Sequence, residues 1–391
     1  MDFYPIMLER MPELQEFRRT LHRHPELSNH EFETARFVER KLDEWGIPHE
    51  RVGETGVYAE IRGGLGEGRT VALRADMDAL PIQEENDVPY RSECPGVMHA
   101  CGHDMHTSSL LAAAKALQEN RDKFAGSVRL MFQQAEEIGE GARLFVRGGK
   151  MDGVDRIFGI HTAPDLKLGT VGVKSGPNNA SVDCFKVKIH GKAAHVSTPQ
   201  LGADALFVAA QSVVALQSLI TRRTSPIDSV IIGVGKLTAG TAYNIVAEEA
   251  YFEGTTRLFT AALRRDVNDM VTRTIHAVAE LYGAKAEIEW LDFTPPLENP
   301  EDICREVRPV VADMLGADAV VTDRALSCGG DNFADFQLAA PGVYAYVGVR
   351  SPEVPGSEGP LHNSHYNIDE RALPIGAALY AQMAWHWLAE N

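Results

Sequence analysis

The segment that most limits what this chain can fold into is His-Ala-Cys-Gly-His-Asp-Met-His, at residues 99–106. It concentrates a thiol, three imidazoles and a carboxylate, which are side chains that bind transition metals. A buried cysteine or histidine by itself is more often an ordinary core residue. The clustering, with Gly102 allowing a tight turn between Cys101 and His103, instead predicts a metal site that the fold must assemble.

Three further polar segments offer groups for the same site. Glu136 and Glu137 follow a strand-like run, His161 ends the run Arg-Ile-Phe-Gly-Ile-His, and His362 lies in Leu-His-Asn-Ser. Together they supply soft and borderline ligands and one spare carboxylate for general base work. Asp104 is expected to accept a hydrogen bond from an imidazole N–H group.

Apolar runs and helical periodicity predict an α/β fold for the first part of the chain. The expected strands are 57–62, 70–76, 127–132 and 156–160, and the expected helices are 6–24, 30–45 and 105–120. The glutamates and His161 are expected just past the ends of their strands, and the strand 70–76 brings Asp76 and Asp78 to its carboxyl end. Active sites of open α/β sheets gather at that edge.

From about residue 180 the pattern becomes that of an antiparallel sheet with helices. The expected elements are 183–190, 203–221, 229–237, 245–258, 262–281 and 285–291. Their β-α-β-β-α-β order predicts a ferredoxin-like insert. Helices at about 300–315 and 370–388 and a strand at 342–349 are expected to resume the first domain. We therefore predict a discontinuous metal-binding domain, 1–178 and 295–391, and an inserted domain, 179–294.

Composition and charge exclude several classes of partner. The 391 residues include 55 acidic and 38 basic side chains, for a net charge of −17, so neither nucleic acid nor an anionic membrane is expected as a partner. The first residues lack a signal-peptide pattern, and no run approaches the about 18 apolar residues of a membrane span. The five scattered cysteines suit reduced thiols, so a cytoplasmic protein is expected.

Five blocks of the chain, in order, resemble the signature motifs of the M20 metallopeptidase family. Their form is similar to that of its amidohydrolase branch, which holds aminoacylases, hippurate hydrolases and plant auxin-conjugate hydrolases. The resemblance covers nearly the whole chain. The blocks are Leu-His-Arg-His-Pro-Glu-Leu at 21–27, Leu-Arg-Ala-Asp-Met-Asp-Ala-Leu-Pro at 73–81, residues 95–106, Phe-Gln-Gln-Ala-Glu-Glu at 132–137, and Leu-His at 361–362.

The resemblance implies a dinuclear-metal aminopeptidase-like fold, with a mixed sheet flanked by helices and an inserted α+β lid. It also implies a homodimer joined through the lids, and pairing of such dimers stays open. Two divalent ions per subunit are implied, and Zn, Mn, Co and Ni all suit the donor set. Glu136 is implied as the general base. The implied metal ligands are Cys101, His103, Glu137, His161 and His362.

The resemblance further implies that His195, Asn244 and Arg257 of the lid face the substrate. His195 would stabilise the oxyanion of the tetrahedral intermediate, and the planar guanidinium of Arg257 suits a carboxylate. From the residues alone, two other interpretations stay open. His195 also fits a surface loop, and Arg257 also fits an exposed strand position paired with Glu253 or Glu249.

The chain departs from the family pattern at three places. Ala247 stands where relatives have the proline of Asn-x-Ile-Pro, and Asn363 follows His362 where relatives have serine. Asp331 and Asn332 replace the acidic pair of Ser-Glu-Asp-Phe. These departures remove none of the implied ligands and leave the base in place, but they bear on the preference for acyl group and amino acid.

We therefore predict a metal-dependent amidohydrolase that splits a small-molecule N-acyl amino acid into a carboxylic acid and a free amino acid. A divalent ion lowers the pKa of bound water from about 15.7 to about 7, and a carboxylate such as Glu136 removes the proton. Two alternatives stay open: a dipeptidase or aminopeptidase on the same site, and a non-catalytic metal-binding dimer. The presence of Glu136 argues against the second, because a pure binder needs no base beside the metal.

Overall fold

The computed structural model describes residues 1–389, which divide into two compact units. Unit 1 consists of Met1–Gly176, Asn299–Ala325 and the chain from Asn332 onward, and unit 2 consists of Pro177–Glu298 and Leu326–Asp331. These limits lie within a few residues of the predicted domain boundaries. The difference is the short return to unit 2, where the amide of Ser327 donates to Asn178 O and the amide of Ala180 donates to Ser327 O.

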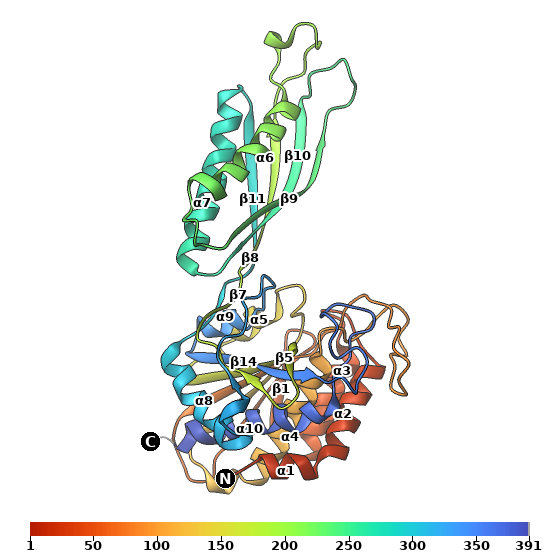
Figure 1. Ribbon diagram of the computed structural model, residues 1–391, viewed down its shortest axis with the longest axis vertical. Coiled ribbons are helices and arrows are strands. Elements are labelled where there is room, and N and C mark those ends of the chain that lie inside the picture. The colour runs from red at the N-terminus through yellow and green to blue at the C-terminus, as the bar shows by residue number, and fades with distance from the viewer. Residues whose placement is uncertain (390–391) are drawn as a thin grey trace. The chain divides into compact units, whose positions relative to one another are not determined.

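Unit 1 is built on an eight-stranded mixed sheet (Figure 1), the class that the sequence predicted. Its strands β4, β3, β5 and β14 run parallel, and β2 pairs antiparallel with β4. The spatial order is β1 (His49–Val52), β2 (Gly56–Arg62), β4 (Ser127–Gln133), β3 (Thr70–Asp76), β5 (Arg156–Lys167), β14 (Gly342–Arg350), β6 (Val171–Gly172) and β13 (Val320–Val321).

Helices cover this sheet, and α4 and α10 lie side by side against it (Figure 1). Both helices are buried along most of their length, as their apolar sequences require. This packing fixes the N-terminal end of α4, where Cys101 and His103 lie. The helices of unit 1 are α1 (Tyr4–Glu9), α2 (Met11–Arg23), α3 (Phe32–Glu44), α4 (His103–Glu119), α5 (Gly141–Arg147), α8 (Glu301–Leu315), α9 (Phe333–Gln337) and α10 (Leu373–Ala389).

Two expectations about unit 1 are corrected. The helix expected over 6–24 is two helices that meet at Arg10, because Pro12 is accommodated in the first turn of a new helix. The strand expected to end just before His161 continues to Lys167, since His161 and the residues after it keep pairing with β14. His161 therefore lies inside a strand and not past its end.

Unit 2 has the predicted β-α-β-β-α-β order. Its antiparallel sheet has the spatial order β11-β8-β10-β9, and two helices pack on the sheet and bury strand side chains such as Phe185 and Phe252. The short strands β7 (Gly176–Asn179) and β12 (Leu297–Asn299) form a separate pair. The elements are β8 (Val182–His190), α6 (Ala205–Arg222), β9 (Val230–Ala239), β10 (Glu249–Leu258), α7 (Ala261–Leu281) and β11 (Lys285–Thr294).

Helix α6 is long and apolar enough to cross a membrane, judged by length and composition only. In unit 2 it packs on the sheet through a face that includes Ala205, Val208 and Leu216. The core helix of a globular domain satisfies the same test of length and composition, and this packing explains the apolar residues on the buried face of α6; 33% of the apolar stretch is buried.

Candidate active site

A glycine turn at the start of α4 sets the positions of Cys101 and His103. Gly102 has a φ of 88°, and a Cβ atom there would lie 2.6 Å from Thr162 Oγ1. The hydroxyl of Thr162 donates to Cys101 O at 3.1 Å. Only glycine combines this backbone conformation with so close an approach, so the Cys-Gly-His order brings both side chains next to β5.

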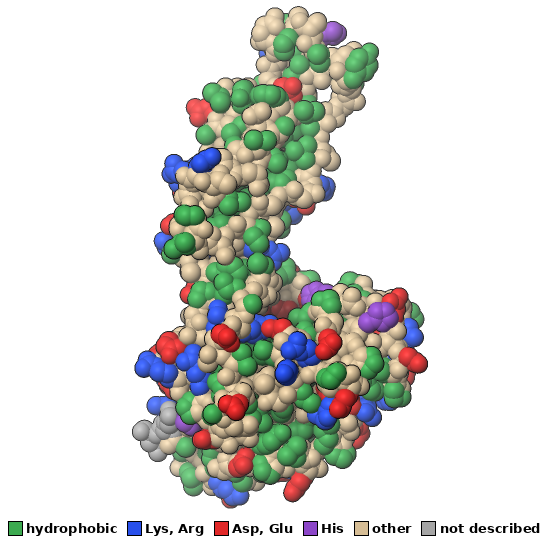
Figure 2. All heavy atoms as spheres, viewed as in Figure 1, with side chains coloured by type: hydrophobic (Ala, Val, Ile, Leu, Met, Phe, Trp, Pro, Cys, Tyr) green, Lys and Arg blue, Asp and Glu red, His purple; other side chains and the backbone are tan. Residues whose placement is uncertain are grey.

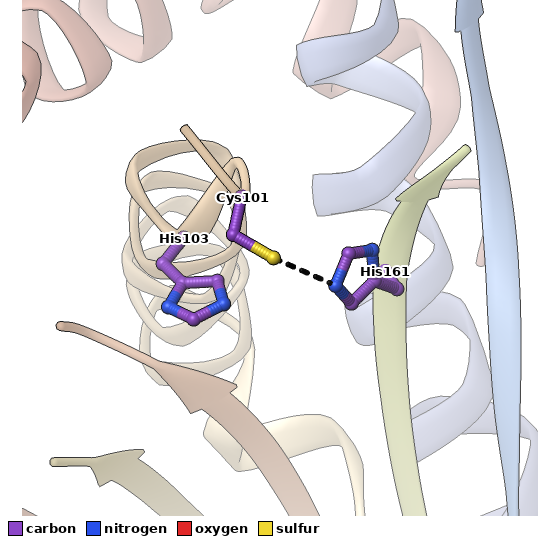
Figure 3. Close-up of side chains that lie close together, drawn as sticks. All are labelled: Cys101, His103 and His161. Atoms are coloured by element: carbon purple, nitrogen blue, oxygen red, sulfur yellow. Dashed lines mark hydrogen bonds between the residues drawn. The ribbon is translucent and has the colours of Figure 1, made fainter. Parts of the chain in front are cut away.

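Two imidazoles point a ring nitrogen into one cluster with the thiol. Cys101 Sγ lies 3.5 Å from His161 Nε2, and the ring of His103 lies beside the Cys101 side chain at the start of α4 (Figure 3). His161 Nδ1 lies 2.7 Å from Thr162 O, and His103 Nδ1 lies 2.8 Å from Asp78 O. A proton on each Nδ1 satisfies these carbonyls and leaves each Nε2 with its lone pair, as a metal ligand requires.

Glu137 and His362 complete the cluster. Glu137 Oε1 lies 3.8 Å from His103 Nε2, and Glu137 Oε2 lies 3.4 Å from His362 Nε2. His362 has a φ of 61°, and its amide donates to Ala100 O at 2.8 Å, which joins its loop to the start of α4. The five side chains implied as ligands are thus brought together from four segments of unit 1.

The chemistry of the cluster fits a bound cation. His103 Nε2 and Glu137 Oε1 are buried and have no hydrogen-bond partner among the described residues, an arrangement that is costly unless another group satisfies them. Burial, and secondly the charge of Glu137, raise the pKa of Cys101 well above its usual value, while burial lowers the pKa of His161 well below its own. Burial alone would lower the pKa of His103, but the charge of Asp76 raises it well above its usual value. A divalent ion would therefore meet a neutral imidazole at His161 and would displace a proton from both the Cys101 thiol and the His103 ring.

Glu136 lies beside the presumed ligands. Its side chain is 8% exposed, and Oε1 accepts the amide N–H of Asn332 at 3.3 Å. One oxygen of Glu136 lies within 4.8 Å of ligand atoms of both His103 and Glu137. Ala135, immediately before it, has a φ of 51°, so a tight turn after β4 directs the two glutamates into the site. This is the placement that a general base for a metal-bound water needs.

The third histidine of the 99–106 segment has a supporting position. His106 Nδ1 lies 2.6 Å from Asp76 Oδ1, and His106 Nε2 accepts the amide N–H of Thr162 at 3.0 Å. Both ring nitrogens are therefore engaged, although Asp76, His103 and His106 lie close enough to be grouped as ligands. The sequence signal for this support was the pair Asp76 and Asp78 at the carboxyl end of a buried strand.

Asp104 contacts an imidazole, as predicted, but this imidazole belongs to His22, which is not one of the presumed metal ligands. Asp104 Oδ2 lies 2.8 Å from His22 Nδ1 and accepts from Arg18 Nε at 2.9 Å. His22 Nε2 lies 3.1 Å from Glu84 Oε1. Burial alone would lower the pKa of His22, but hydrogen bonds to Asp104 and Glu84 raise it overall. A buried ionic network thus joins α2 to the first turn of α4.

The remaining predicted site residues belong to unit 2. His195 lies in an exposed loop, where its Nδ1 is 2.7 Å from Ser197 Oγ and its backbone pairs with Ile245. The amide of Val196 donates to Asn244 O at 3.1 Å, so His195 and Asn244 are neighbours at one end of the sheet. As the sequence allowed, His195 is a loop histidine, and its role in the site stays a prediction.

Arg257 lies near the end of β10 and is half-buried. The pairing of Arg257 with Glu253 that the sequence left open is not found. Glu253 instead accepts from the Tyr251 hydroxyl at 2.7 Å and from Lys236 Nζ at 2.9 Å. Nor does Arg257 form an ion pair with Glu249 in the described part of the chain. Its guanidinium therefore remains available to a ligand.

The length of β10 separates Arg257 from the pair His195 and Asn244. Glu249 begins the strand and Arg257 lies near its end, and eight residues of antiparallel strand span about 27 Å at about 3.4 Å per residue. His195 and Asn244 lie beyond the Glu249 end. One copy of unit 2 therefore cannot place His195, Asn244 and Arg257 together on one small substrate.

The chain belongs to a known family of metallohydrolases. Residues 72–386 match the model of peptidase family M20/M25/M40. This match covers most of the chain, including the segments that carry Cys101, Glu136, His161 and His362. The chain is therefore a member of the M20 family, and the family predicted from the five sequence blocks is confirmed.

Relatives with established names match nearly the whole chain. An N-acetyl-L-cysteine deacetylase of Bacillus subtilis is 41% identical over 91% of this chain and 83% of its own length. An IAA-amino acid hydrolase, ILR1-like 4, of Arabidopsis thaliana is 36% identical over 95% of this chain and 85% of its own length. The predicted class, a hydrolase of the amidohydrolase branch, is confirmed by these matches.

Solved structures share the fold over the whole chain. The YXEP protein of Bacillus subtilis, a dinuclear metal-binding peptidase of the M20 family, has a TM-score of 0.84 at 35% identity and covers 97% of this chain and 99% of its own. A putative aminohydrolase of methicillin-resistant Staphylococcus aureus has a TM-score of 0.94 at 31% identity and covers 99% and 100%. The predicted fold class is therefore confirmed.

Proposed function

We propose that this protein is a metal-dependent amidohydrolase that splits N-acyl amino acids into a carboxylic acid and a free amino acid. The observation that carries the proposal is the cluster of Cys101, His103, Glu137, His161 and His362, which is buried at Cys101, His103 and His161 and exposed at His362, with Glu136 beside it. The relatives named as a deacetylase of N-acetylcysteine and a hydrolase of an amino-acid conjugate support an amide between an acyl group and an amino acid as the bond cleaved.

We propose that the cluster would hold two divalent ions through Cys101, His103, Glu137, His161 and His362. Cys101, His103 and His161 form one group of close ligand atoms, and Cys101, Glu137 and His362 form another. When bound, such ions acidify a water molecule and polarise the scissile carbonyl. Imidazole, thiolate and carboxylate donors accept Zn, Mn, Co or Ni, so cellular supply decides which metal is used.

Glu136 is proposed to act first as base and then as acid. Its carboxylate takes a proton from the attacking water and later gives that proton to the leaving nitrogen. The amide N–H of Asn332 holds one carboxylate oxygen in place. His195 is proposed to donate a hydrogen bond to the oxyanion that forms on the acyl carbon.

Unit 2 is proposed to act as a lid and to join two subunits in a homodimer. Its edge strand β9 has one neighbour in the described sheet, and α6 exposes Leu206, Phe207 and Val214. Apolar side chains are exposed over the surface of this unit (Figure 2). One copy cannot bring residues from both ends of β10 to one substrate. In the dimer, His195 of one subunit would act at the active site in which Arg257 of the other subunit binds the substrate.

The proposed partners are small molecules and a second copy of the chain, in the cytoplasm, with no role for nucleic acid or a membrane. The net charge of −17 supports this assignment because it opposes binding to polyanions.

Replacing the substrate's α-carboxylate by a carboxamide is expected to lower kcat/KM at least about tenfold, corresponding to roughly 1.4 kcal/mol. The reason is that the half-buried, unpaired guanidinium of Arg257 can bind a carboxylate through two hydrogen bonds. Kinetics on matched acid and amide substrates would measure the ratio.

Arg257→Ala is expected to erase most of that discrimination, whereas a general loss of lid packing would slow both substrates alike. The matched control is Arg265→Ala, because Arg265 is exposed on α7 and pairs with Asp266. This variant should keep the parental ratio of kcat/KM between acid and amide. Equal rates on acid and amide in the parent protein would refute the carboxylate clamp and favour the peptidase alternative.

Metal is expected to protect Cys101 from alkylation, and chelation is expected to expose it, because a coordinated thiolate is neither free nor accessible. Mass spectrometry of labelled peptides would measure this for each cysteine. Cys304, a buried thiol outside the cluster, and the exposed Cys328 are internal controls whose labelling should not depend on metal. Equal labelling of Cys101 with and without metal would remove it from the proposed ligand set.

The function itself is tested by a product-resolved screen of the purified protein loaded with each metal in turn. The substrates are N-acetyl amino acids, hippurate and dipeptides, assayed side by side. Release of a carboxylic acid and an amino acid supports the proposal. Turnover of dipeptides alone would favour the peptidase, and no turnover with any metal would favour a non-catalytic binder.

A further inference from the structure

A fully buried arginine lies behind the proposed active site. Arg74, on β3, has no exposed surface, and its guanidinium donates to four side chains. Nε donates to Gln133 Oε1 at 2.8 Å, and Nη1 donates to Asp76 Oδ2 at 2.6 Å and to the Tyr344 hydroxyl at 3.1 Å. Nη2 donates to Asn332 Oδ1 at 3.0 Å. The planar donor fork of arginine thus fixes groups from three strands and the segment before α9 in one geometry.

One branch of this network reaches the proposed base. Asn332 Oδ1 accepts from Arg74 and also from Gln133 Nε2 at 2.9 Å, so its side chain is held from two sides. The backbone N–H of the same residue donates to Glu136 Oε1 at 3.3 Å. Arg74 and Gln133 therefore hold the side chain of the residue whose backbone N–H donates to Glu136.

A second branch reaches the proposed ligands. Asp76, bonded to Arg74 through Oδ2, also contacts His106 through Oδ1 at 2.6 Å. His106 in turn accepts the amide N–H of Thr162, the residue after His161. The same guanidinium therefore sets the base and a ligand strand relative to each other.

The orientation of the Asn332 side chain leaves one of its polar atoms unsatisfied. Its Nδ2 is buried and has no hydrogen-bond partner among the described residues. The amide cannot be turned to relieve this, because Arg74 offers only donors and Oδ1 must face them. An unsatisfied buried donor is unfavourable, so the geometry at this position is held at a cost to stability.

Accepting Glu136 as the base, as proposed above, we infer that Arg74 and Asn332 are positioning residues for the hydrolysis: the guanidinium orients Asn332, and the backbone N–H of Asn332 holds the Glu136 carboxylate beside the ligands. Neither residue touches the reacting atoms. Their contribution is to the chemical step and not to substrate affinity.

The test uses Asn332→Ala and the milder Arg74→Lys in the full-length, metal-loaded protein. Each is expected to lower kcat about tenfold or more, with KM and metal content within about twofold of the parent. Crystal structures should show the Asn332 N to Glu136 Oε1 contact lengthened or lost. The control is Arg156→Met, because Arg156 is the first residue of β5 and pairs with Glu306. In this variant, kcat and the contact between Asn332 N and Glu136 Oε1 should be unchanged.

Epistasis separates positioning from a general structural role. In a Glu136→Gln background, adding Asn332→Ala is expected to lower the residual kcat less than about twofold, whereas loss of fold or metal would lower it further. An unchanged contact in both single variants, or full additivity with Glu136→Gln, would overturn the inference. If the parent hydrolyses no N-acyl amino acid, the proposed function fails, and the crystallographic contact still decides the positioning claim.

Discussion

Replacing Glu136 by glutamine is expected to lower kcat by about 10²–10⁴-fold, the usual contribution of a general base. Glutamine has nearly the same size but cannot take the proton of the attacking water. Because Glu136 lies beside the proposed ligands and is not one of them, the metal content of the variant should stay near that of the parent. Turnover of the best N-acyl amino acid and metal per subunit would be measured together.

Glu137→Gln is the matched comparison, because it makes the same change at the next residue. Glu137 lies close to both His103 and His362, so this variant is expected to lose metal as well as activity. Turnover of Glu136→Gln within a few-fold of the parent would reject its role as base. Full metal occupancy in Glu137→Gln would reverse the two assignments.

Replacing Arg18 by methionine is expected to destabilise the protein by about 3–5 kcal/mol, because it breaks a buried ion pair and leaves His22 as the remaining cationic partner of Asp104. Arg18 and Asp104 are each 1% exposed, and Nε of Arg18 donates to Asp104 at 2.9 Å. Arg18 also donates to Asn367 Oδ1 at 3.1 Å, near the loop that carries His362. Denaturant unfolding, compared at constant m value, would measure the loss.

The neighbouring Arg19 provides a control with the same change. It pairs with Glu370, which Arg18 also contacts, but its side chain is 36% exposed. Exposed ion pairs typically contribute less than about 1 kcal/mol, so Arg19→Met should be nearly neutral. Equal losses from the two variants would show that Asp104 does not depend on Arg18.

The metal-binding segment and the strand before the two glutamates could be predicted from the sequence because their signals are local, whereas the full ligand set was implied by the family resemblance and stays a prediction. The 99–106 segment concentrates metal-binding side chains, and the strand before Glu136 has a clear apolar pattern. The order of elements in unit 2 followed from the same periodicity, since each strand there buries alternate residues on one face. Structural features whose sequence signal spans no more than about a dozen residues could therefore be predicted.

The supporting network could not be predicted, because its members are far apart in the chain and follow no period. Arg74 lies within an apolar run, and nothing near it indicates that its partners are Asn332 and Tyr344. The continuation of β5 beyond His161 also depends on pairing with β14, nearly two hundred residues later. Such contacts are set by tertiary structure, which overrides local preference.

The discontinuity of unit 1 has a consequence for biosynthesis. β14 pairs with β5 and α10 packs on α4, yet both leave the ribosome only after the whole of unit 2 has been made. Because domains fold as they emerge, unit 2 is expected to be complete while the edge of β5 and the apolar side of α4 are still uncovered. His362 is supplied by the same late segment. A nascent chain therefore carries Cys101, His103, Glu137 and His161 before the last proposed ligand, His362, has been made, so the proposed metal cluster would be completed late in synthesis.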